Sequence, residues 1–194
     1  FHCVPSFVVG LDRKVKVQGL GEVTYDLAYG GAFYAFVDAD ELGIGMERKD
    51  YHQLIDWGRK IKYAVMEHYE IKHPFEEDLS FLYGTIFTGK AQDPKHHSRN
   101  VCIFAEGELD RSPTGSGVSA RAAIHHAKGE LEEGQKITIE SILGTTMEVE
   151  VKTLTTYGPH DAVVPEVSGT AHITGQSEFY FDPEDPLREG FIFR

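Results

Sequence analysis

Alternation of apolar and polar residues with a period of two recurs along the chain and is the pattern that most limits how it can fold. The alternating segments are short, are rich in β-branched and aromatic residues, and are bounded by Gly or Pro. They occupy residues 5–9, 15–18, 21–43, 79–89, 101–110, 136–142, 146–157 and 161–181, and a further one follows a turn within residues 185–194. The sequence therefore predicts many short antiparallel strands, with a polar loop at residues 91–100.

Two segments interrupt the strand pattern with the spacing of helices. Residues 50–72 carry one apolar stripe, and the acidic first residue of this segment is the predicted N-cap. A second helix of about four turns is predicted to follow the Gly-rich turn at residues 110–117. Gly30 and Gly31 are adjacent within a strand segment, which indicates a bulge or a close backbone approach. The combination predicts an α+β fold in which many short antiparallel strands surround two helices.

Composition and charge exclude several classes of partner. The 194 residues are enough for one domain with a buried core, and the net charge is −12. Sequence-independent nucleic-acid binding and docking on an anionic membrane both need basic patches, so neither is expected. No apolar run approaches the roughly 18 residues that a membrane-spanning helix needs.

The two cysteines, Cys3 and Cys102, lie far apart, and neither belongs to a CxxC motif. This usage favours two ordinary buried thiols and a reducing compartment, the cytoplasm. The first residues, FHCVPSFVV, contain no initiating Met and no basic leader, and they read like a strand entered in mid-sequence. We therefore expect the chain to begin inside a longer protein.

The turn before the second predicted helix is the strongest candidate for a binding site. It reads DRSPTGSG at residues 110–117. Backbone N–H groups at a helix start lack intrahelical partners and lie at the positive end of the helix dipole, and Gly115 and Gly117 let an anion approach them. A carboxylate or a phosphate is the expected ligand, and a plain Ser/Thr cap with turn glycines is the structural alternative. The lysine of a Walker A loop and the GxGxxG spacing are both missing.

The side chains around this turn each have a functional and a structural interpretation. Asp110 can pair with a substrate ammonium group, or it can form an Asx-turn or a salt bridge to Arg111. Phe104 is either a pocket wall or a core residue. Thr114, at the edge of the turn, is a helix cap, a ligand contact or the replacement of a more reactive residue.

Other residues that often carry chemistry give weaker signals. The histidine pairs at residues 96–97 and 125–126 have no companion at metal-binding spacing, so solvated histidines and no metal are expected. Ser112 and Ser116 lack the GxSxG pattern of a nucleophilic serine.

Several of these motifs together resemble the proline racemase family. The resemblance rests on DRSPTGSG, on the preceding VCIFAEGELD, on YGGAFYAFVD at residues 29–38 and on the tail PEVSGTAHITGQSEFYFDPEDPLREGFIF at residues 165–193. The segments GGAFYAFV and LSFLYGTI, the latter at residues 79–86, are most similar to the trans-3-hydroxy-L-proline dehydratase branch. The similarity extends through essentially the whole chain.

The resemblance implies one half of a two-domain fold of the diaminopimelate epimerase type, with short antiparallel strands wrapped around a central helix. In that family two similar halves face each other, and the substrate carboxylate lies between the N-termini of their central helices. Racemases and epimerases use one cysteine from each half, one removing the α-proton and the other returning one. Where the second cysteine follows DRSP in racemases, this chain has Thr114. An alcohol is too weak an acid to serve as an ordinary general base, so two-base racemisation is disfavoured.

A dehydratase needs only one base, and the resemblance therefore implies a cofactor-free hydro-lyase that forms Δ1-pyrroline-2-carboxylate. Carried over residue by residue, Asp110 holds the ring nitrogen, Gly115 and Ser116 bind the carboxylate through their N–H groups, and Phe104 is an apolar wall. Thr114 replaces the second cysteine and either contacts the departing hydroxyl or caps the helix.

The family's first-half motif, a cysteine followed by Gly-His, is absent from this chain. We therefore expect residues 1–180 to be the second catalytic half and residues 181–194 to pack on a first half, with this chain inactive alone. A proline racemase or 4-hydroxyproline 2-epimerase is the main alternative, and a non-catalytic amino-acid-binding module is the second. A hydroxyproline substrate and the first half are the expected partners, and a homodimer stays open.

Overall fold

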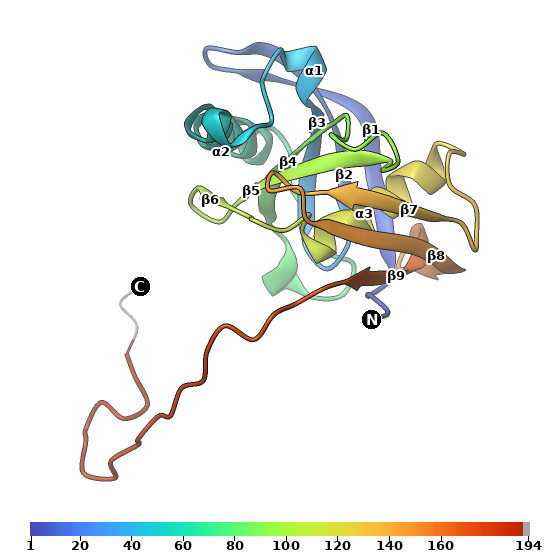
Figure 1. Cartoon of the computed structure of the whole chain (residues 1–194). Helices are drawn as coiled ribbons and strands as arrows, with labels where there is room; N and C mark the ends of the chain where they lie inside the picture. The colour runs from blue at the N-terminus through green and yellow to red at the C-terminus, as the bar shows by residue number, and fades with distance from the viewer. Residues whose placement is uncertain (192–194) are drawn as a thin grey trace.

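A computed structural model describes residues 1–191 and shows a mixed α/β fold built on a closed barrel of eight strands (Figure 1). The sheet order is β4-β3-β2-β1-β9-β8-β7-β5, and β5 pairs with β4 to close the ring, while the short β6 extends from β5. The strands are β1 (Ser6–Val17), β2 (Gly21–Tyr29), β3 (Phe33–Asp38), β4 (Leu82–Gly89), β5 (Ser98–Phe104), β6 (Glu108–Leu109), β7 (Lys136–Glu140), β8 (Thr146–Tyr157) and β9 (His160–Gly169).

Most strand pairs are antiparallel, as expected, but two pairs are parallel. β3 runs parallel to β4, and β5 runs parallel to β7. A parallel neighbour requires a crossover connection rather than a hairpin. The segment with α2 (Tyr51–His68) supplies the first crossover, and the segment with α3 (Gly115–Ala127) supplies the second. The predicted antiparallel arrangement therefore fails at these two places, where a predicted helix separates the paired strands.

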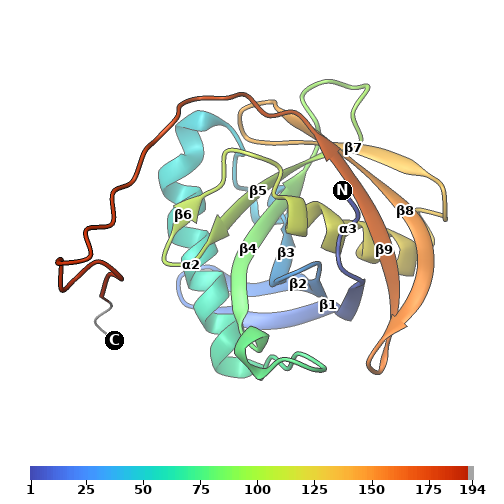
Figure 2. The ribbon, with the colours of Figure 1, turned by 90° about the horizontal axis from the view of Figure 1, so that it is seen from below.

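The first predicted helix is α2, which lies along the outer side of the barrel and contacts β4, β1 and β5 (Figure 2). Its apolar stripe places Leu54, Ile61 and Val65 in the core. The predicted cap, Asp50, makes no capping bond to α2 and accepts instead from the backbone N–H of Glu47. The remaining short helices are α1 (Ala39–Leu42), η1 (Arg48–Asp50) and η2 (Glu77–Leu79).

The second predicted helix, α3, is buried along most of its length. Every residue from Gly117 to Ile124 is buried, and the helix contacts β1, β2, β8 and β9. Val118 and Ala122 enter one core cluster with side chains of β7, β8 and β9, whereas Ala120 and Ile124 enter another with side chains of β2, β3, β4 and β5. A helix that is apolar on opposite faces belongs inside a core rather than on a surface.

A buried polar network fixes α3 and links it to the turn that precedes it. Arg121 donates to Asn100 Oδ1 at 2.9 Å, and Asn100 Nδ2 donates to the carbonyl oxygen of Pro113 at 3.1 Å. Arg121 also donates to His125 Nε2 at 3.0 Å. An arginine cannot accept, so the His125 proton lies on Nδ1, which donates to Glu130 at 2.6 Å. His125 is therefore held neutral.

The structure changes the predicted bounds of one loop before α3 and of the strands near the end of the chain. The predicted strand at 161–181 ends at Gly169, and residues 170–191 form no strand or helix in the structure. The predicted polar loop at 91–100 is shorter than expected, because β5 begins at Ser98. A turn precedes Gly190 as predicted, while the last predicted strand falls largely on residues 192–194, outside the described residues. No helix of the described chain is long and apolar enough to cross a membrane.

The adjacent glycines mark a close approach between a strand end and α3. A Cβ atom added at Gly30 would overlap the carbonyl oxygen of Ser116 and lie 2.5 Å from the amide nitrogen of Ala120. Both neighbours are backbone, so they cannot rotate away. The structure confirms the close-approach interpretation of this pair.

We expect Gly30→Ala to lower the free energy of unfolding by about 2 kcal/mol or more, because the new methyl group has to displace α3. Gly10→Ala is the matched control, since its Cβ would meet only the flexible side chain of Arg13. Urea unfolding of both variants measures the difference. Equal stabilities would contradict the close approach.

A second prediction concerns pH. Burial, aided by the neighbouring Arg121, lowers the pKa of His125 to about 4 from 6.5. As pH falls below about 6.5 the unfolded chain takes up a proton that the folded chain refuses, so stability is lost between about pH 6.5 and pH 4, by at most about 3 kcal/mol. Urea unfolding across this range should show the loss, and His125→Gln should reduce its slope. An unchanged slope would show that His125 is not the titrating group.

Candidate functional site

The start of α3 offers backbone N–H groups that the helix itself does not use. The first intrahelical bond runs from Val118 N to Thr114 O at 2.8 Å, so the amides of Gly115, Ser116 and Gly117 precede it. Thr114 occupies the N-cap position, but its side chain makes no capping hydrogen bond. The interpretation of this turn as a plain Ser/Thr cap is therefore wrong. These amides lie at the positive end of the helix dipole, where an anion is stabilised.

The two glycines of the turn have different structural roles. A Cβ added at Gly117 would lie 2.5 Å from Ile86 Cδ1, so this glycine permits close packing of α3 on β4. A Cβ added at Gly115 would meet only the Phe1 ring, at 3.5 Å. Packing therefore does not require a glycine at Gly115, where a Cβ would make an ordinary contact with the Phe1 ring.

The hydroxyl group of Thr114 is directed to Asp110 and not to the helix. Thr114 Oγ1 donates to Asp110 Oδ2 at 2.8 Å, and the amide of Ser112 donates to Asp110 Oδ1 at 2.8 Å. The second bond confirms the Asx-turn interpretation of Asp110, and no ion pair joins Asp110 to Arg111 among the described residues. Thr114 is buried, with a φ of +72°, which is uncommon for a β-branched residue and is held by these contacts.

A cavity of about 310 Å³ borders Ser116 in the first turn of α3. Tyr34 Oη and Ser116 Oγ form a 2.8 Å hydrogen bond at its wall. Its lining consists of small residues and aromatic rings from three segments: Gly31, Ala32, Tyr34, Leu79, Phe81, Tyr83 and Ser116. Phe104 stands behind this wall, with its ring centroid 5.5 Å from that of Tyr83.

Tyr34, Phe81 and Tyr83 were not among the predicted site residues. Period-two alternation places successive side chains on opposite faces of a strand, but it does not show which strand ends meet the start of α3. The adjacent glycines at 30–31 were the one usable signal, because they mark where the turn into β3 touches Ser116.

Cys102 does not have the environment of a reactive thiolate. Burial raises the pKa of the Cys102 thiol, which lies beneath the turn, and the backbone carbonyl of Cys102 accepts from the amide of Asp110 at 3.0 Å. Cys3 is half-buried and donates to the carbonyl oxygen of Gly30 at 3.4 Å. The prediction of a buried thiol is confirmed for Cys102.

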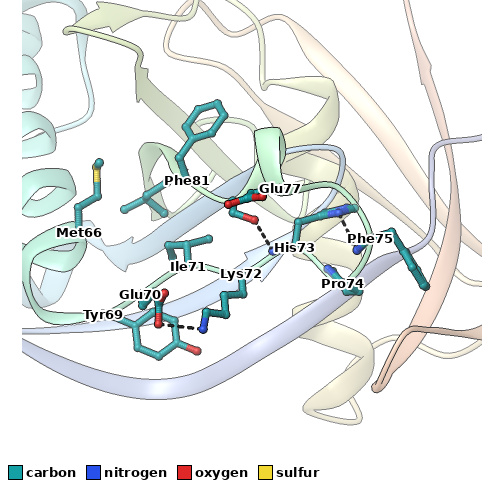
Figure 3. Close-up of a pocket in the computed structure, with 12 residues that line it drawn as sticks. Met66, Tyr69, Glu70, Ile71, Lys72, His73, Pro74, Phe75, Glu77 and Phe81 are labelled. Carbon is teal, nitrogen blue, oxygen red and sulfur yellow. Dashed lines mark hydrogen bonds and ion pairs between the residues drawn. The ribbon is translucent and has the colours of Figure 1, made fainter.

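A larger hollow of about 700 Å³ lies between the end of α2 and β4 (Figure 3). Several of its polar groups have partners within the same loop. His73 Nδ1 accepts from the amides of Phe75 and Glu76, at 3.3 and 2.9 Å, and Lys72 pairs with Glu70 at 3.0 Å. The smaller cavity is the better candidate site, because it adjoins backbone donors that have no intrahelical partner.

The structure shows no metal site, since no group of three or more His, Cys, Asp or Glu among residues 1–191 could hold an ion. The prediction that the paired histidines are solvated is wrong for three of the four. His96 contacts the buried Glu140 at 2.9 Å, His125 lies in the Arg121 network, and His126 bonds to the carbonyl oxygen of Leu131 at 2.9 Å. Glu140 lies 44 residues from His96, whereas the partners of His125 and His126 lie four or five residues away and belong to α3 or to the turn that follows it.

Comparisons with known proteins show which family the chain resembles. A family model described as proline racemase matches residues 1–192. The chain is 50% identical to a trans-3-hydroxy-L-proline dehydratase of Colwellia psychrerythraea, covering 100% of this chain and 55% of the relative. It is 44% identical to a human protein of the same name, again covering 100% of this chain and 55% of the relative. The chain thus spans about half the length of the curated relatives it matches.

Solved structures show the same relationship. A hydroxyproline epimerase from Agrobacterium vitis, with bound trans-4-hydroxy-L-proline, superimposes with a TM-score of 0.87 at 34% identity. The match covers 99% of this chain and 55% of that one. The barrel, the Gly-rich start of α3 and a family match over nearly the whole sequence lead to one conclusion: this chain belongs to the proline racemase family.

Proposed function

We propose that this chain is the second catalytic half of an enzyme that dehydrates trans-3-hydroxy-L-proline to Δ1-pyrroline-2-carboxylate. The observation that carries the proposal is Thr114, which stands where the racemase pattern has its second cysteine and donates its hydroxyl proton to Asp110. Relatives named trans-3-hydroxy-L-proline dehydratase support it.

The reaction needs one base and one leaving group. A cysteine of the first half removes the α-proton, the C3–O bond breaks, and the hydroxyl takes up a proton and leaves as water. The resulting enamine then tautomerises to the cyclic imine. An alcohol such as that of Thr114 does not return a proton to the opposite face, because its pKa is far above that of a thiol.

The residues of this half bind and orient the substrate in the proposal. The N–H groups of Gly115 and Ser116 hold the carboxylate, and Asp110 holds the ring nitrogen. A carboxylate has about four acceptor positions, so Asp110 can take this contact while keeping both internal hydrogen bonds. Thr114 has one proton and gives it to Asp110, which leaves its oxygen to accept from the substrate hydroxyl. Phe104 supports the apolar wall through Tyr83.

The proposal also covers how the chain fits its enzyme. Residues 1–180 form a second half whose strands surround a central helix, and residues 181–194 pack on the first half, although residues 192–194 lie outside the described part. Exposed aromatic side chains such as Tyr180 and Phe181, 85% and 74% exposed, support this packing. In the proposal the reaction requires no cofactor and takes place in the cytoplasm. This chain without the first half does not catalyse it. A homodimer stays open.

Epimerisation of hydroxyproline is the second candidate function. The structural match to the Agrobacterium vitis epimerase, at a TM-score of 0.87, favours it. A proline racemase falls in the same class. The two reactions differ in whether a proton returns to the α-carbon from the opposite face.

The complete enzyme should form pyrroline-2-carboxylate from trans-3-hydroxy-L-proline, and Thr114→Cys should add epimerase activity. In D2O the variant should place deuterium at the α-carbon of recovered 4-hydroxyproline of inverted configuration, measured by NMR. Robust epimerisation by the wild-type enzyme without dehydration would contradict the proposed function. A Thr114→Cys enzyme with no label uptake would show that Thr114 is not the vacated cysteine position.

Asp110→Asn should lower kcat/KM by about 100-fold, because a charge-assisted contact to the ring nitrogen is lost. Asp93→Asn is the matched control, since Asp93 also accepts from a backbone amide two residues on, at 2.9 Å, but lies far from α3's start. Steady-state kinetics and a melting curve separate binding from folding. A control as impaired as Asp110→Asn would argue against the assigned role.

A further inference from the structure

Ser116 is the one residue with a side chain among the first three residues of α3, which read Gly-Ser-Gly. Its hydroxyl therefore supplies the only side-chain hydrogen bond that can tie these three residues to the sheet. That bond joins Ser116 Oγ to Tyr34 Oη at 2.8 Å. Tyr34 is on β3, 82 residues earlier in the chain, and is 1% exposed.

The backbone of Ser116 is confined as well. Its carbonyl oxygen touches Gly30, where no Cβ fits. Gly31, at φ +107°, places the turn into β3 next to the Ser116 side chain, with 3.5 Å between an added Cβ and Ser116 Cβ. The Gly30–Gly31 turn thus confines one side of the residue, and Tyr34 holds its hydroxyl. Together they set the direction of the first-turn amides.

Tyr34 is a rigid anchor for this purpose. Its ring makes edge contacts with Phe36 and Tyr83, at centroid distances of 6.3 and 5.9 Å. Burial raises the pKa of Tyr34, so its phenol stays neutral and keeps its proton across the working pH range. A neutral hydroxyl beside the amides also avoids placing a negative charge where a carboxylate has to bind.

We propose that Tyr34 is a positioning residue for the carboxylate site: through Ser116 Oγ it orients the first-turn N–H groups of α3 toward an amino-acid carboxylate. The inference rests on the proposed function for the identity of the ligand. It assigns Tyr34 no contact with reacting atoms. Loss of the Tyr34 hydroxyl should therefore weaken substrate binding, and it should do so only while Ser116 keeps its own hydroxyl.

The test is a double-mutant cycle in the complete enzyme with Tyr34→Phe, Ser116→Ala and the double variant. Tyr34→Phe keeps the ring and removes one oxygen. We expect it to raise KM, and the Kd for L-proline measured by calorimetry, by about tenfold, with kcat changed less. In the Ser116→Ala background the same change should add nothing further. Tyr63→Phe is the matched control. Tyr63 lies on α2, and the variant removes an exposed hydroxyl that donates to Glu106 at 2.6 Å.

An unchanged Kd and KM in Tyr34→Phe, or losses that multiply in the double variant, would overturn the inference. So would an equal effect of Tyr63→Phe. Proline binding does not require turnover, so the inference is tested even if the wild type forms no pyrroline-2-carboxylate. That outcome would remove the proposed reaction while a weakened Tyr34→Phe complex still supported the positioning role. A wild type that binds no imino acid would contradict both.

Discussion

The burial of α3 inside the sheet is the constraint on which the site depends. A helix buried from Gly117 to Ile124 must satisfy its polar side chains internally, and Arg121 does so through Asn100 and His125. Asn100 in turn holds the carbonyl oxygen of Pro113, so the network that anchors the middle of the helix also fixes the turn before it. The same packing requires Gly30, where an added Cβ would overlap the backbone of α3, and it brings Ile86 Cδ1 within 2.5 Å of an added Cβ at Gly117.

The sequence identified elements better than it identified contacts. Residues 50–72 and the segment after 110–117 do form helices, because an apolar stripe and a Gly-rich start are local signals. The parallel pairs β3–β4 and β5–β7 depend on which strands become neighbours, and so does the contact of His96 with Glu140. The sequence did not single out Tyr34, and only the structure shows its hydroxyl hydrogen-bonded to Ser116.

The proposed site rests on the physical chemistry of the turn before α3 and on the family match, and neither is sufficient alone. The Gly-rich turn predicts an anion-binding helix start, and the structure shows that the Thr114 side chain makes no capping hydrogen bond there. The family match covers nearly the whole chain but about half of each relative, so the reacting base lies outside this half in the proposed reaction. Thr114 supports dehydration in this account, because loss of water needs only one base whereas epimerisation needs two.

The central claim is that the start of α3 binds the substrate carboxylate. Amide chemical shifts of the complete enzyme, recorded while trans-3-hydroxy-L-proline is added, test it most directly. The account predicts that the amides of Gly115 and Ser116 shift downfield and saturate with the substrate, because both become donors to a carboxylate. Shifts that leave these two amides unchanged and gather instead around His73 and Phe75, in the larger hollow, would contradict it.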